Sequence, residues 1–142
     1  MALRVGLIGA GHWGPNLAHL DGWNRQRRMV AEMYRERLAP LELPLVELTA
    51  QSESAYHLFV LRVQDRDEVL QAMVDRGIEA GIHYPIPVHL LEAYKHLGYG
   101  EGSFPVAEVM CREVLSLPMY PELTSEQVDR VVEALENALE TG

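Results

Sequence analysis

The glycine-rich turn near the start of the chain is the first pattern whose residue types and spacing could do chemistry. Gly9, Gly11 and Gly14 match G-x-G-x-x-G, directly after an apolar segment at 4–8 that predicts a short buried strand. Such glycines allow a tight turn and close approach of a pyrophosphate, and the N-terminus of the following helix supplies free N–H donors. The turn is therefore a candidate dinucleotide-binding element.

The rest of a dinucleotide site does not follow this turn. A second strand that ends in Asp or Glu is needed about 20 residues further on. Glu32 and Glu36 lie near that distance, but in a segment whose apolar spacing predicts continuous helix. Because a single strand–turn–helix cannot enclose a dinucleotide, we expect no NAD(P) binding, and a bare structural turn is the alternative.

A second candidate site lies around two prolines at 85 and 87. His83, Tyr84 and His89 occur in Ile-His-Tyr-Pro-Ile-Pro-Val-His at 82–89, where each proline disfavours helix in the residue before it. A rigid, extended segment of this kind can present side chains to a substrate, although packing or hydrogen bonding within the domain is the alternative role. No histidine pair has helical i, i+4 spacing with a carboxylate partner, so we expect no metal site.

The elements that must position these residues alternate between helix and strand. Apolar spacing, prolines and glycines predict helices at 16–38, 65–76, 88–97, 104–115 and from 124 onward, and strands at 45–48, 57–63 and 78–83. Asp65 is the expected N-cap of the second helix, Gly77 and Gly98 are expected to end helices, and 124–127 forms a capping box. We expect an α/β domain, with a small three- or four-stranded sheet covered by helices.

Composition limits the classes of partner. The chain has 142 residues, of which 48% are hydrophobic, which suits one domain with a core of its own. The net charge of −9 repels a phosphate backbone, so we expect no nucleic-acid partner. No apolar run approaches the length of a membrane span, so we expect no membrane partner and a cytoplasmic location.

Several motifs in a fixed order resemble one known family. From about residue 19 the chain is similar to the C-terminal part of the DegT/DnrJ/EryC1/StrS family of PLP-dependent aminotransferases, which aminate keto-sugar nucleotides. The matching segments are 20–28, 56–62, 66–70, 77–78, 82–89, 104–108 and 115–121. The resemblance implies the small C-terminal domain of the type I PLP-dependent transferase fold, a homodimer, a sugar-nucleotide substrate, and a place near the substrate cleft for His83, Tyr84 and His89.

The resemblance also implies a lysine that the sequence does not place. A transaminase uses a lysine to form the Schiff base with PLP and to move protons. Lys95 is the single lysine, and its context matches a peripheral helix of the small domain. We therefore assign no catalytic residue, and we expect PLP in the complete family enzyme but not in this chain alone.

The first 17 residues resemble a different family. The wording Leu-Ile-Gly-Ala-Gly-His-Trp-Gly at 7–14 is similar to the start of the Gfo/Idh/MocA NAD(P)-dependent oxidoreductases. We interpret 1–17 as a Rossmann-like strand–turn–helix remnant joined, by fusion or deletion, to an aminotransferase-like small domain with its linking helix at 18–142. The alternatives are an oxidoreductase fragment and a non-catalytic dimerisation or binding module. Without a large domain to pack on, the first 40 residues are expected to dock loosely.

Overall fold

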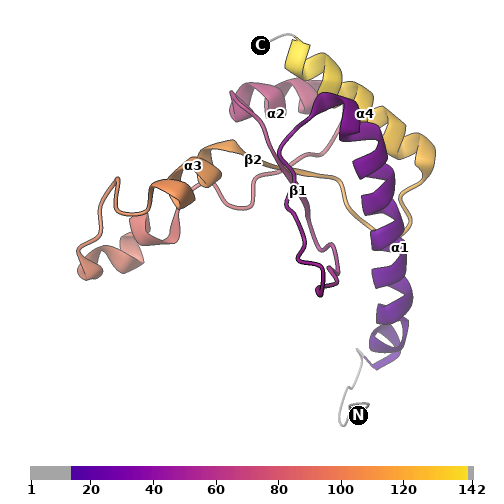
Figure 1. The fold of residues 1–142 in the computed structure, drawn as a ribbon, viewed down its shortest axis with the longest axis horizontal. Helices are drawn as coiled ribbons and strands as arrows, with labels where there is room; N and C mark the ends of the chain where they lie inside the picture. The colour runs from indigo at the N-terminus through magenta and orange to yellow at the C-terminus, as the bar shows by residue number, and fades with distance from the viewer. Residues whose placement is uncertain (1–13, 141–142) are drawn as a thin grey trace.

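The described part of the chain, residues 14–140 of a computed structural model, folds around a small antiparallel sheet (Figure 1). The helices are α1 (Gly14–Leu38), α2 (Arg66–Asp75), α3 (Pro105–Glu113) and α4 (Ser125–Glu140), the 3₁₀ helices are η2 (Ala39–Leu41), η3 (Val88–Leu90) and η4 (Glu92–Leu97), and the strands are β1 (Phe59–Arg62) and β2 (Val114–Leu117). None of the helices within the described residues is long and apolar enough to span a membrane.

The sheet is narrower than the sequence predicts. β1 and β2 pair in antiparallel register, with Leu61 opposite Leu115. The strands expected at 45–48 and 78–83 shrink to single bridges, Leu45 with Leu61 and Gly81 with Ser116, which flank the pair on either side. Pro44 precedes the first segment and Pro85 follows the second. Because proline has no N–H for a ladder, these prolines limit how far either pairing can extend.

The two faces of the sheet have different surroundings. Residues paired across antiparallel strands point to the same face, and alternate residues point to opposite faces. One face carries Phe59, Leu61, Leu115 and Leu117, and these side chains are buried in one core with residues of α1, α2 and α4. The other face carries Val60, Arg62, Val114 and Ser116, and the candidate histidine His83 lies against it at Ser116.

The C-terminal half of α1 is an integral part of this core. Val30, Ala31, Tyr34 and Leu38 are buried, and α1 packs along α4. Arg37 of α1 also pairs with Asp129 and donates to the Ser125 hydroxyl at 2.6 Å. The expectation that the first 40 residues dock loosely is therefore wrong for 30–38, because the apolar face of α4 supplies the packing surface. Leu17 and Leu20, nearer the start of α1, remain exposed.

Local stop and start signals are confirmed at three of four positions. The capping box of α4 forms in both directions, with the Thr124 N–H 2.9 Å from Gln127 Oε1 and the Gln127 N–H 3.3 Å from Thr124 Oγ1. Gly77 and Gly98 both have a φ of +76°, which suits glycine after a helix. The expected side-chain cap from Asp65 does not form, because Asp65 itself takes a left-handed conformation with a φ of 45°.

Two predicted helices differ in type or extent. The segment expected as one helix at 88–97 forms the separate 3₁₀ helices η3 and η4. The helix expected at 104–115 ends at Glu113, and the following residues Val114 and Leu115 belong to β2. Pairing with β1 explains this boundary, because it buries both side chains, and tertiary contacts override local helix propensity.

Tyr34 provides a test of the seam between α1 and the sheet. Its hydroxyl donates to the Pro118 carbonyl at 2.9 Å, its ring lies 4.9 Å from that of Phe59, and burial raises its pKa. Tyr34→Phe should lower the free energy of unfolding by about 1 kcal/mol, the typical net value of one hydrogen bond. Urea unfolding measures it, with Tyr94→Phe on an exposed ring as a control expected to stay within about 0.5 kcal/mol. Equal stabilities of Tyr34→Phe and the unaltered chain would contradict this packing.

Candidate functional site

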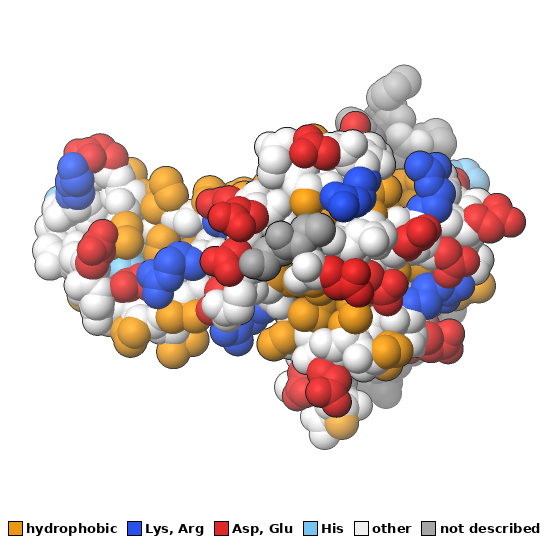
Figure 2. Space-filling view, turned by 90° about the horizontal axis from the view of Figure 1, so that it is seen from above, with side chains coloured by type: hydrophobic (Ala, Val, Ile, Leu, Met, Phe, Trp, Pro, Cys, Tyr) orange, Lys and Arg blue, Asp and Glu red, His pale blue; other side chains and the backbone are white. Residues whose placement is uncertain are grey.

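The candidate residues lie on or beside an arm that projects from the core. Residues 83–113 extend away from the sheet and from α1, α2 and α4, as the salmon and orange ribbon in Figure 1 shows. Figure 2 shows hydrophobic side chains gathered over this projecting part of the surface. The large exposed apolar residues of the arm are Tyr84, Ile86, Val88, Leu91, Tyr94, Leu97, Tyr99, Phe104 and Val106. The apolar side chains of the arm are therefore exposed, and they are accessible to a ligand or to another protein surface.

His83 lies where the arm leaves the sheet. Its Nδ1 atom is 3.0 Å from the hydroxyl oxygen of Ser116 on β2, and its ring makes an edge contact with the ring of Tyr84 at 5.6 Å. Tyr84 itself is 72% exposed. These two predicted residues therefore form one accessible pair beside the sheet.

His89 lies in a different environment. Its side chain is only 8% exposed, and Nε2 is 3.0 Å from a carboxylate oxygen of Glu108, so the ring donates to an acceptor within the arm. The ring also stacks at an angle against Phe104, with centroids 4.8 Å apart. This geometry favours a positioning role for His89 over direct contact with a substrate.

Glu108 holds the arm together through backbone donors. Its carboxylate accepts the Gly102 N–H at 2.9 and 3.0 Å and the Phe104 N–H at 3.2 Å, besides the bond from His89. Phe104 is the N-cap residue directly before α3, so this carboxylate fixes both a loop and a helix start. The Gly102 N–H, followed by the other donors, lowers the pKa of Glu108 below its usual range and keeps the carboxylate ionised.

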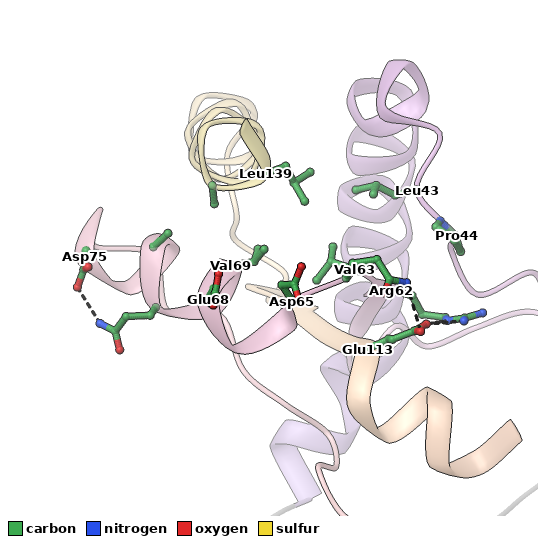
Figure 3. Close-up of a pocket in the computed structure, with 14 residues that line it drawn as sticks. Leu43, Pro44, Arg62, Val63, Asp65, Glu68, Val69, Asp75, Glu113 and Leu139 are labelled. Atoms are coloured by element: carbon green, nitrogen blue, oxygen red, sulfur yellow. Dashed lines mark hydrogen bonds and ion pairs between the residues drawn. The ribbon is translucent and has the colours of Figure 1, made fainter. Parts of the chain in front are cut away.

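A separate hollow in the described structure lies between α2, α4 and the end of β1 (Figure 3). It has a volume of about 630 Å³, an apolar floor that includes Val63, Val69 and Leu139, and acidic groups at its edge. Arg62 lies at one end, where Nε donates to Glu113 at 2.8 Å. That bond is the main cause that lowers the pKa of Glu113. With its one cation paired, this groove presents mostly negative charge and does not suit a phosphate group.

The described residues do not fit PLP. Lys95 lies on the surface helix η4, with its side chain 68% exposed and its Nζ atom 2.5 Å from Glu92. The Lys95 ammonium is exposed, paired, and outside the hollow described above, so it is not poised to form a Schiff base. No group of three or more His, Cys, Asp or Glu side chains within 14–140 could hold a metal ion.

The glycine turn falls mostly outside the described residues. Gly9 and Gly11 lie outside the described residues, and Gly14 is the first residue of α1. The expectation that this candidate turn binds no NAD(P) therefore stays a prediction.

Two polar residues of the site were missed from the sequence. Ser116 is a buried serine in a strand whose other residues are apolar, which is a signal visible in Val-Leu-Ser-Leu at 114–117. Glu113 is the partner of Arg62 across 51 residues, and no local pattern indicates that pairing.

Comparison with known proteins decides the family. The profile of the DegT/DnrJ/EryC1/StrS aminotransferase family matches residues 11–136. The chain belongs to this family. It is 46% identical over 120 residues to the erythromycin biosynthesis sensory transduction protein EryC1 of Saccharopolyspora erythraea, and 43% identical over 120 residues to the dTDP-3-amino-3,4,6-trideoxy-alpha-D-glucose transaminase of Streptomyces venezuelae. Each alignment covers 84% of this chain, but 33% and 32% of the respective relatives.

The solved structures of family members agree on the fold. The crystal structure of S. venezuelae DesV in complex with a ketimine intermediate superposes with a TM-score of 0.82 at 42% identity, over 87% of this chain and 34% of that protein. The α/β class with a small sheet and covering helices is thereby confirmed, and the structural neighbours are PLP aminotransferases of the type I fold. The family is PLP-dependent, and related structures from Streptococcus pneumoniae include PLP and PMP forms. The chain spans about a third of the length of these relatives.

We expect the carboxylate of Glu108 to make the arm of this family member sensitive to pH. Because the folded pKa of Glu108 is depressed, its contribution to stability is complete above the usual glutamate pKa of about 4.3 and is lost as the pH falls through the lower folded value. Glu108→Gln should speed hydrogen exchange of the Gly102 and Phe104 amides at pH 7, since an amide oxygen replaces only part of the acceptor set. The difference in exchange rate between Glu108→Gln and the unaltered chain should shrink in strong acid, where Glu108 is protonated.

The control for this experiment is Glu101→Gln, because Glu101 is exposed in the same loop. It should leave both amides protected. Unchanged protection in Glu108→Gln would show that the carboxylate does not hold the arm.

Proposed function

We propose that this chain acts as the small-domain part of a PLP-dependent sugar-nucleotide aminotransferase, which aminates a keto-sugar nucleotide in a cytoplasmic homodimer. The observation that supports this best is the family match over 11–136, together with 43% identity to a transaminase named for a dTDP-sugar. PLP and its lysine would come from residues other than those described, because Lys95 does not fit that role. Residues 1–142 alone would then not transaminate.

Within this proposal, His83 and Tyr84 are the residues that reach the substrate. Both belong to the exposed end of the arm next to the sheet, and a ring N–H or a phenol can bond the oxygens of a sugar nucleotide. His89 would support them indirectly, since Glu108 occupies its Nε2 atom. The exposed apolar residues of the arm also favour the alternative of a non-catalytic binding or dimerisation module.

We further propose that 1–17 derive from a Gfo/Idh/MocA-like start and that 18–142 form the aminotransferase-like domain. The match to the aminotransferase family begins at residue 11, inside that start, and α1 runs without a break from Gly14 to Leu38. The similar proteins include transaminases named for dTDP sugars, and this supports an aminotransferase over the alternative of an oxidoreductase.

A chimera tests the proposed function. The segment of the S. venezuelae transaminase that aligns with this chain is exchanged for this chain's residues, and transaminase activity on that enzyme's sugar nucleotide is measured. We expect activity, and we expect His83→Ala in the chimera to lower kcat/KM about tenfold, equivalent to about 1.4 kcal/mol. The loss follows from removing one hydrogen bond to the substrate.

His96→Ala is the matched control, since His96 is an exposed histidine of the same arm whose one hydrogen bond within 14–140 is to the Ala93 carbonyl. It should leave kcat/KM unchanged. A chimera that folds and binds PLP but does not transaminate would favour the non-catalytic module instead.

A further inference from the structure

A buried serine interrupts the apolar strand β2. Ser116 is only 3% exposed, and the other three residues of β2 are buried valine and leucine. A buried hydroxyl without a partner costs about 1–3 kcal/mol. The Ser116 hydroxyl therefore needs a hydrogen-bond partner inside the protein.

The partner is His83, and the chemistry of the two groups sets the direction of the bond. Within 14–140, the only hydrogen bond that the Ser116 hydroxyl makes is to His83 Nδ1, at 3.0 Å. A hydroxyl carries one proton and needs an acceptor for it, and a neutral imidazole has one donor nitrogen and one acceptor nitrogen. If Nδ1 were the donor, the buried Ser116 proton would have no acceptor among these residues. The bond therefore runs from the hydroxyl to Nδ1.

The ring is also held on its other sides. Gly81 pairs with Ser116 through two backbone hydrogen bonds, of 2.9 and 2.8 Å. A Cβ atom added at Gly81 would lie 3.2 Å from Cε1 of His83, closer than most contacts of that kind. Tyr84 meets the ring edge-on at 5.6 Å. His83 is thus seated on the Gly81–Ser116 bridge, while the residue as a whole remains exposed.

We propose that Ser116 is a positioning residue that fixes neutral His83 as its Nε2–H tautomer. With Nδ1 occupied as an acceptor, the outward nitrogen carries the proton and is a hydrogen-bond donor. The ligand atom that it suits is an acceptor oxygen, of the kind found in a sugar hydroxyl or a phosphate. The identity of that ligand rests on the proposed function, but the tautomer and the role of Ser116 do not.

The tautomer is measured directly on the full chain. Long-range ¹H–¹⁵N spectra of histidine-labelled protein at alkaline pH distinguish the two neutral tautomers, and His83→Gln assigns the signal. We expect His83 to give the Nε2–H pattern alone. His96 is an internal contrast, because its Nδ1 lies 3.1 Å from the Ala93 carbonyl, which can only accept. The exposed His57 reports the mixture of an unconstrained ring.

Variants of Ser116 decide whether it sets the tautomer. Ser116→Ala should move His83 to the mixture shown by His57, and Ser116→Thr, which keeps the hydroxyl, should retain the single tautomer. If Ser116→Ala does not fold, Gly81→Ala should displace the ring and give the same mixture. An Nδ1–H pattern in the unaltered chain would overturn the proposal, as would a pattern that removal of the hydroxyl leaves unchanged. Neither result would bear on the aminotransferase activity of the chimera, so the two proposals fail separately.

Discussion

One constraint governs the structure: two strands of four residues each must bury one of their faces. Leu61 and Leu115 lie opposite each other in the register and have no exposed surface. Burying a leucine side chain completely contributes about 1.5–3 kcal/mol, but an isolated two-stranded sheet is marginal in water. The helices α1, α2 and α4 must therefore cover this face together, and the core that results includes Tyr34, Met73 and Leu135.

Covering one face determines what happens on the other. The alternation of a strand places Ser116 opposite its buried neighbours, on the face without the helical layer. The chain pairs with β2 at Gly81, along the edge of the sheet, and His83 follows two residues later. The arm beyond His83 has few apolar contacts with the core, so polar bonds to Glu108 hold its loop in place. The protein therefore has a packed core and an arm whose exposed apolar and histidine side chains can meet a ligand or another domain.

Local signals and family motifs in the sequence predict much of this structure. The family, the α/β class and the caps at Gly77, Gly98 and Thr124 were predictable, because each depends on a few neighbouring residues. The buried role of α1 was not, since it depends on the facing surface of α4, about 90 residues away. The strand boundaries failed at 45–48 and 78–83 because hydrogen-bond partners, rather than propensity, decide where a short strand continues.

The candidate site shows the same limit. Sequence motifs identified His83, Tyr84 and His89 together, and their separation into an accessible pair and a buried histidine depends on Ser116 and Glu108. Those partners lie 33 and 19 residues away in the chain. A motif can therefore indicate which residues matter, but their individual roles follow from contacts that only the fold brings together.

Native-state hydrogen exchange across the chain tests most directly whether the linking helix and the sheet form one unit. We expect amides at 30–38 to open with the same free energy as those of β1, β2 and α4, because they share one core. Residues of the arm at 88–104 should open more readily. Exchange at 30–38 that is as fast as in the exposed first turns of α1 would contradict the first expectation, since the helix would then not belong to the core that supports the site.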